Sequence, residues 1–106
     1  MPKYLYQGSY TDKGLQGLMK DGGSKRVEIT KKAIESLGGK METYYFALGG
    51  KDFFIIIEAP NNANAITGSL IANASGTVEV SITALVSPEE VDLAVKQTMD
   101  WSPPGK

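Results

Sequence analysis

The chain has 106 residues, a net charge of −1 at pH 7, and neither cysteine nor histidine. A chain of this length is expected to form one domain, and its near-neutral charge offers no basic surface for nucleic acid. The missing cysteine and histidine remove disulfides, thiol nucleophiles and the commonest metal ligands, so we expect no metal and no cofactor.

Targeting and membrane signals are also missing from the sequence. No basic segment followed by an apolar run stands at the amino terminus. No apolar stretch approaches about 18 residues, the length that suggests a membrane-spanning helix. The expectation is a cytoplasmic protein that does not bind membranes.

The first elements follow from alternation and from capping residues. Residues 3–10 alternate in side-chain character and predict a strand. Thr11 and Asp12 are suitable caps for a helical turn after it. A longer helix is predicted for residues 24–37, with Ser24 as its cap. Gly38-Gly39 is typical of a left-handed helix end.

Two apolar runs, residues 40–48 and 53–58, flank Gly49-Gly50-Lys51-Asp52 and predict a hairpin with a short loop. In that interpretation the glycines take positive φ angles. The second run is apolar on both strand faces, which indicates a strand in the middle of a sheet covered on both sides. Because helices in so short a chain cover one face, the other face is expected to meet a second copy of the chain.

The remaining elements are a helix, a strand and a short helix. Asn61 or Asn62 is predicted to cap a helix that Gly76 closes. Residues 77–85 alternate cleanly and predict a half-solvated strand near a sheet edge. Ser87 begins a capping box for a short helix that ends at about Gln97.

This order of elements predicts an α+β, ferredoxin-like βαββαβ fold with a terminal helix. The sheet is expected to be antiparallel and four-stranded, with strands one and three central and the helices on one face. Residues 1–98 are expected to form the domain, and residues 99–106 a flexible C-terminal tail.

The chain contains an ordered set of short motifs: Tyr10-Thr11, Gly14, Arg26, Gly38-Gly39-Lys40, Asp52, Glu58-Ala59-Pro60 and Gly76-Thr77-Val78. Together these motifs resemble the GYD-domain family over about residues 2–95. Lys51 stands where the family's Gly-Tyr-Asp has tyrosine. The resemblance implies the dimeric α+β barrel superfamily, in which the open sheet faces of two subunits pack together.

Seven residues are candidates for binding a ligand, and each also has a purely structural interpretation. The loop offers backbone amides and one carboxylate, or it is simply a turn. The arginine offers a bidentate cation, or a surface ion pair. The tyrosines offer hydroxyls, or core packing, and a glutamate at the end of a buried strand is a possible acid or base. The candidates are Tyr6, Arg26, Tyr44, Gly49, Gly50, Asp52 and Glu58.

Three functions are compatible with these patterns. The first is a small homo-oligomeric module that binds a small metabolite near the hairpin turn or between sheet and helices. The second is a cofactor-independent isomerase or monooxygenase that uses Tyr6, Tyr44 and Glu58. The third is a structural assembly protein whose only task is association. The sequence identifies neither a ligand nor a catalytic residue.

Overall fold

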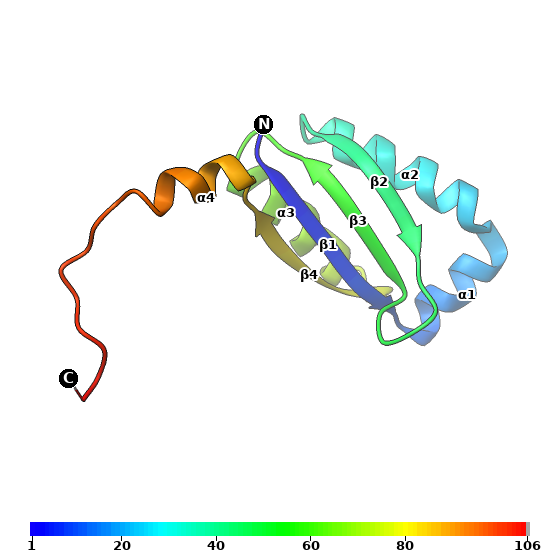
Figure 1. The fold of residues 1–106 in the computed structure, drawn as a ribbon. Coiled ribbons are helices and arrows are strands. Elements are labelled where there is room, and N and C mark those ends of the chain that lie inside the picture. Colours follow the sequence, from blue (N-terminus) through cyan, green and yellow to red (C-terminus); the bar gives the residue numbers. More distant parts are fainter. Residues whose placement is uncertain (106) are drawn as a thin grey trace.

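The structure, a computed structural model, describes residues 1–105 (Figure 1). Strands and helices follow one another in the predicted order, and the helical turn predicted after the first strand is a helix of ten residues. In chain order the elements are β1 (Lys3–Tyr10), α1 (Asp12–Asp21), α2 (Gly23–Ser36), β2 (Lys40–Phe46), β3 (Phe53–Glu58), α3 (Asn62–Ala74), β4 (Val78–Leu85) and α4 (Pro88–Ala94).

The four strands form one antiparallel sheet in the order β2-β3-β1-β4. β1 and β3 are central, and β4 is an edge strand, so the ferredoxin-like prediction is confirmed. In Figure 1 the helices α1, α2 and α3 lie behind the sheet. α2 contacts β2 and α3 contacts β4, so the two long helices cover opposite halves of one sheet face.

The core lies between that face and the helices. Alternate residues of the central strands point into it, and the side chains of Tyr4, Phe53 and Ile57 are each at most 3% exposed. Ile34 of α2 and Ala65 of α3 meet these side chains from the helix side. The face of β3 that carries Phe53, Ile55 and Ile57 is therefore buried within the chain itself.

Most of the predicted helix ends are confirmed. The Thr11 hydroxyl accepts from the Gly14 amide at 3.2 Å, and the Asn61 side chain accepts from the Asn64 amide at 3.0 Å. Gly38 and Gly76 have φ angles of 79° and 76°. Only glycine takes this left-handed conformation without strain, and it ends α2 and α3 as expected.

Four local predictions were wrong. Ser24 lies inside α2, whose N-cap is Gly22 and has no side-chain cap. β2 ends at Phe46, so the hairpin loop is longer than predicted. Gly49 and Gly50 do not have the predicted positive φ angles. The terminal helix likewise ends at Ala94 rather than near Gln97.

β2 contains a bulge that strict alternation did not predict. Met41 and Tyr44 both pack against the core, although they are three residues apart and should point to opposite faces. The pairing register with β3 shifts between Met41 and Thr43, which leaves Glu42 as the extra residue. The Glu42 carboxylate then reaches Lys3 of β1, with Oε1 to Nζ at 2.5 Å.

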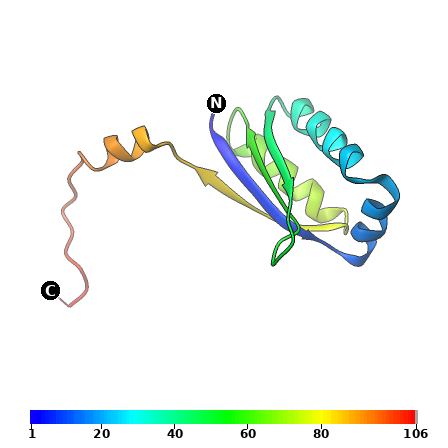
Figure 2. The same ribbon diagram turned by 45° about the vertical axis from the view of Figure 1, so that its right-hand side comes forward.

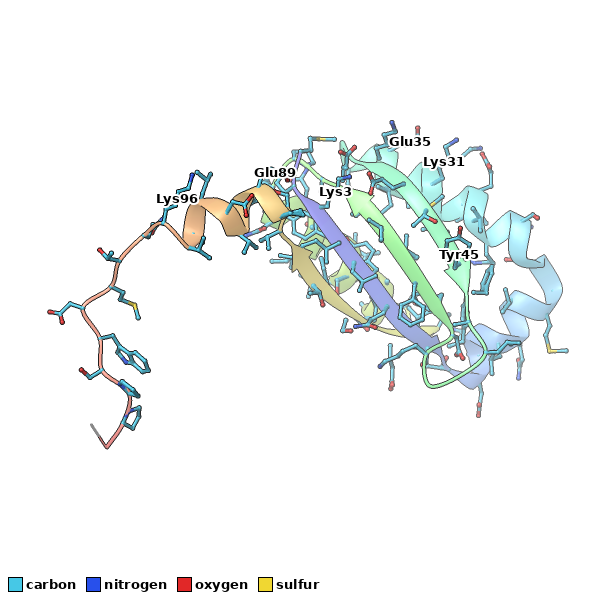
Figure 3. All side chains as sticks on the ribbon, viewed as in Figure 1. Lys3, Lys31, Glu35, Tyr45, Glu89 and Lys96 are labelled. Carbon is cyan, nitrogen blue, oxygen red and sulfur yellow. The ribbon has the colours of Figure 1, made fainter. Side chains whose placement is uncertain are left out.

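The second sheet face is not covered by the described part of the chain. We call it the open face; it carries Leu5, Gln7, Tyr45, Phe54 and Ile56, the residues that alternate with the buried ones. Tyr45 is 69% exposed, and its ring stands off β2 in Figure 3. Figure 2 shows the helices on one side of the sheet, and the segment after β4 leaving the body on the other side.

Candidate functional site

A cavity of about 530 Å³ lies between the sheet and the two long helices. It exists because α2 and α3 cover opposite halves of the sheet, which leaves a gap above the central strands. Aromatic side chains of the sheet form its floor, and small or branched residues of the helices form its walls. The floor comprises Tyr6, Tyr10, Tyr44, Phe53 and Ile55; Arg26, Ile29, Thr30, Gly68, Ile71 and Ala72 are among the wall residues.

Two tyrosine hydroxyls meet inside this cavity. The hydroxyl oxygens of Tyr10 and Tyr44 are 3.2 Å apart and share a hydrogen bond. Phe53 holds the Tyr10 ring in an edge-to-face contact with centroids 5.4 Å apart. Burial raises the pKa of Tyr44 well above its ordinary value, and the hydrogen bond to Tyr10 raises this pKa further. Tyr44 is therefore a neutral hydrogen-bond donor near pH 7 and not a base.

Tyr6 belongs to the floor of the cavity and also makes a hydrogen bond that connects two elements of the fold. Its hydroxyl donates to the backbone carbonyl of Ala65, which ties α3 to β1. Burial raises the pKa of Tyr6, so this donor also stays protonated. A side chain at Gly68 would not fit beside it, because a Cβ there would lie 2.9 Å from the Tyr6 hydroxyl oxygen. Glycine at this position lets α3 approach the tyrosine.

Arg26 lines the cavity from the first turn of α2. Its guanidinium lowers the pKa of Tyr44, although by less than burial and the Tyr10 contacts raise it. The Arg26 side chain is 34% exposed and 3.7 Å from the Asp21 carboxylate, a long ion pair that Asp21 shares with Lys25. A cation with so loose a partner has donors left to meet an incoming anion.

The hairpin loop lies outside this cavity. The Asp52 carboxylate accepts from the Tyr10 amide at 2.9 Å, and the Asp52 amide donates to the Gly8 carbonyl at 2.8 Å. These bonds fasten the loop to the end of β1. Asp52 borders a separate hollow of about 360 Å³ beside α1, whereas Gly49 and Gly50 line neither space.

Glu58 also lies away from the cavity. It ends β3 and pairs in register with Lys3 of β1 and Lys40 of β2, two cationic neighbours. Among the described residues that line the cavity, none carries a carboxylate. The structure thus brings together Tyr6, Arg26 and Tyr44 of the candidates, and places Glu58 and the loop residues elsewhere.

The sequence reasoning missed Tyr10 as a cavity residue. The alternation of β1 could have identified it. Side chains two residues apart share a strand face, and Tyr10 shares its face with Tyr4 and Tyr6. Tyr4 lies on the same strand face but near the start of α3, where its hydroxyl donates to the Asn62 side chain at 2.5 Å. No strand pattern could show that the wall residues of α3 would stand opposite these phenols.

Residues 1–105 lack two further features. No group of three or more carboxylates in this part of the chain is placed to hold a metal ion. Within the same residues, no helix is both long and apolar enough to cross a bilayer.

Comparison with known proteins gave one result. The family model described as the GYD domain matches residues 4–95, which cover most of the elements from β1 to α4. This match confirms the resemblance inferred from the ordered motifs. No curated protein and no solved structure matched the chain significantly.

Proposed function

The chain belongs to the GYD-domain family, and we propose that this member binds a small metabolite in the cavity between the sheet and the helices. One observation carries the proposal: a space of about 530 Å³ that joins apolar walls to a cation and two phenolic hydroxyls. Ligand sites of proteins are usually clefts of roughly 300–1,000 Å³ with few convergent polar groups. The cavity satisfies both criteria.

The lining restricts the chemistry of the ligand. Ile29, Ile71 and Val80 present apolar surface, which suits a flat or branched hydrocarbon body. Arg26 and the Tyr10–Tyr44 pair supply donors at one part of the lining. Because no carboxylate lines the cavity and the ion pair of Arg26 with Asp21 is long, these donors favour anions. We therefore infer a largely apolar molecule with one carboxylate or a similar anionic group.

An enzyme is the second candidate, and the hydroxyl pair is the observation that favours it. Cofactor-independent isomerisation or oxygenation needs donors that stabilise an enolate-like oxygen in an apolar pocket. Tyr44, held neutral by its raised pKa, would serve as such a donor. The cavity holds no carboxylate base, and Glu58 lies outside it, so the base would have to come from the substrate or from water.

We further propose that two copies associate through the open face. Tyr45 and Phe54 are 69% and 36% exposed there, and Leu5 and Ile56 lie beside them in register. Aromatic and branched side chains at the centre of a flat face are characteristic of interfaces. Association alone, without a ligand, is the function that would remain if the cavity bound nothing.

The binding proposal is tested with 1-anilinonaphthalene-8-sulfonate, a fluorescent aromatic anion that has both required features. We expect Arg26→Gln to weaken its binding roughly tenfold or more, because a hydrogen bond to a charged group contributes about 1.5–3 kcal/mol. Ala72→Leu should weaken binding by filling the cavity. Lys31→Gln, on the outer side of α2 in Figure 3, is the matched charge control.

Unchanged dye affinity in both Arg26→Gln and Ala72→Leu would refute the site. Because the dye also detects exposed apolar faces, Phe54→Asp is titrated in parallel to measure binding at the open face. Native mass spectrometry of the purified protein then reports any retained molecule. Turnover of small phenolic or lactone substrates, lost in Tyr44→Phe, would favour the enzyme over the binding module.

A further inference from the structure

The segment after β4, residues 86–105, leaves the body of the protein; we call it the C-terminal arm. It comprises α4 and the chain that follows, and both Figures 1 and 2 show it extended away from the sheet. The radius of gyration is 17.1 Å and the longest extent is 57 Å. A compact domain of about 100 residues has a radius of gyration of about 13 Å, so the arm accounts for the elongated shape.

The arm carries six large apolar side chains although it contacts little of its own chain. Its large apolar side chains are between 48% and 76% exposed; they are Val86, Val91, Leu93, Val95, Met99 and Trp101. A tail that stays in solvent is normally polar, because exposed apolar side chains promote association. This composition points to a protein surface as the partner of the arm.

The short helix of the arm also needs a partner. α4 has seven residues and a complete capping box, in which Ser87 and Glu90 exchange side-chain-to-backbone hydrogen bonds at 3.1 Å. Isolated helices shorter than about 12–15 residues are marginal in water, even with good caps. No residue of α4 is buried against the described part of the chain. The packing that stabilises α4 must therefore come from another molecule.

The direction of the arm identifies that molecule. Figure 2 shows α1, α2 and α3 on one side of the sheet and the arm on the other, which is the side of the open face. A second copy stacked on the open face would therefore stand within reach of the arm. We propose that each arm crosses to the second copy and packs against it, so that the two subunits of a homodimer exchange their C-terminal arms.

The surface area that the arms would bury agrees with a second copy of the chain as their partner. Complete burial of a large apolar side chain removes roughly 60–120 Å². The six exposed side chains of one arm would therefore remove about 400 Å². Two arms, with the surfaces they cover, would then bury about 1,600 Å², the standard size of a stable protein interface. Arm exchange requires the homodimer proposed above, but that homodimer does not require arm exchange.

Trp101 provides the test, because it is the only tryptophan in the chain and lies on the arm. The protein of 106 residues is diluted from 100 μM to 10 nM while light scattering gives its mass and fluorescence gives the emission maximum of Trp101. We expect dimers with blue-shifted emission, and a red shift at the concentration where the mass falls to that of a monomer. Phe54→Asp should produce monomers with fully red-shifted emission at every concentration.

Leu93→Ser changes the arm but leaves the fluorophore. We expect it to raise the concentration of half-dissociation about tenfold. Met19→Ser, which changes an exposed methionine on α1, should leave that concentration unchanged. Circular dichroism confirms that each variant is folded. Dimers with fully exposed Trp101 would overturn arm exchange alone, and a stable monomer would overturn the homodimer as well. Blue-shifted emission that persists in monomeric Phe54→Asp would show that the arm folds onto its own subunit.

Discussion

Gly14→Ala is expected to destabilise the protein strongly, whereas Gly17→Ala in the same helix should stabilise it. Gly14 is buried where the first turn of α1 approaches the start of β4, and a Cβ there would lie 1.9 Å from the carbonyl oxygen of Thr77. That oxygen belongs to the backbone and cannot rotate away. Gly17 faces solvent, and a Cβ there would meet nothing within 4 Å.

The magnitude follows from the contacts that α1 would lose on moving away. The Thr11 amide donates to the Thr77 carbonyl at 3.0 Å, and the Thr11 hydroxyl donates to the Gly76 carbonyl at 2.7 Å. Each lost hydrogen bond costs about 0.5–1.5 kcal/mol, and overpacking costs about 1–3 kcal/mol more. The better helix propensity of alanine returns about 0.5–1 kcal/mol. The net loss for Gly14→Ala is therefore about 2–4 kcal/mol.

Thermal unfolding by circular dichroism measures both variants at the same protein concentration. One kcal/mol shifts the Tm of a domain of this size by about 4–8 °C. We thus expect a Tm lower by about 10 °C or more for Gly14→Ala, and a Tm higher by about 3–5 °C for Gly17→Ala, which gains only helix propensity. If Gly14→Ala unfolds within 2 °C of the wild type, the close approach of α1 to β4 is refuted.

Three further changes test the site and its supports. Because burial raises the pKa of Tyr44 above the ordinary value of 10.0, the native state keeps this proton better than the unfolded state. The free energy of unfolding should therefore fall as the pH rises above 10. Tyr44→Phe should reduce that fall in urea titrations at pH 8 and 11, and the raised pKa of Tyr6 accounts for part of what remains. Asp52→Ala removes the acceptor of the Tyr10 amide and should cost about 1–2 kcal/mol in urea titrations, without weakening dye binding in the cavity. Asn73→Ala removes the side chain that both donates to and accepts from the Val80 backbone, and should lower the Tm by several degrees in calorimetry.

Each of these changes has a control or a contradicting result. Tyr45→Phe removes an exposed hydroxyl and should leave the alkaline fall in stability in place. Lys51→Ala alters the same loop as Asp52→Ala without removing a hydrogen bond to β1, and should be neutral. Loss of dye binding in Asp52→Ala would place the ligand at the loop. An unchanged Tm in Asn73→Ala would show that these bonds do not hold α3 to β4.

Local sequence patterns determined the order and type of the elements. The two-residue alternation of β1 and β4 directed Tyr4, Tyr6 and the β4 valines to the helix side, because side chains of a strand alternate between its faces. Thr11, Asn61 and Ser87 marked helix starts, because their side chains satisfy amides that the first turn leaves free. These interactions span only a few residues, so a single sequence suffices to predict them.

The errors in the hairpin loop and in the alternation of β2 share one physical cause, which is control by contacts distant in sequence. The hairpin loop takes its conformation from Asp52, whose amide and carboxylate bond the backbone of Gly8 and Tyr10 more than forty residues away. With these bonds made, Gly49 and Gly50 need no positive φ. The bulge at Glu42 likewise depends on the register between β2 and β3. Neither register nor cross-strand bonds can be read from local periodicity.

The sequence by itself determined the family, the ferredoxin-like order of strands, and a sheet with apolar residues on both faces. Only the tertiary structure decided that Tyr6, Tyr10, Tyr44 and Arg26 share one cavity while Glu58 lies outside it. The reason is that the cavity depends on the gap between α2 and α3, which is set by how each helix packs on its own half of the sheet. The C-terminal arm is a second example. Its apolar side chains can be read from the sequence, but only the direction of the arm in the structure relates them to the open face.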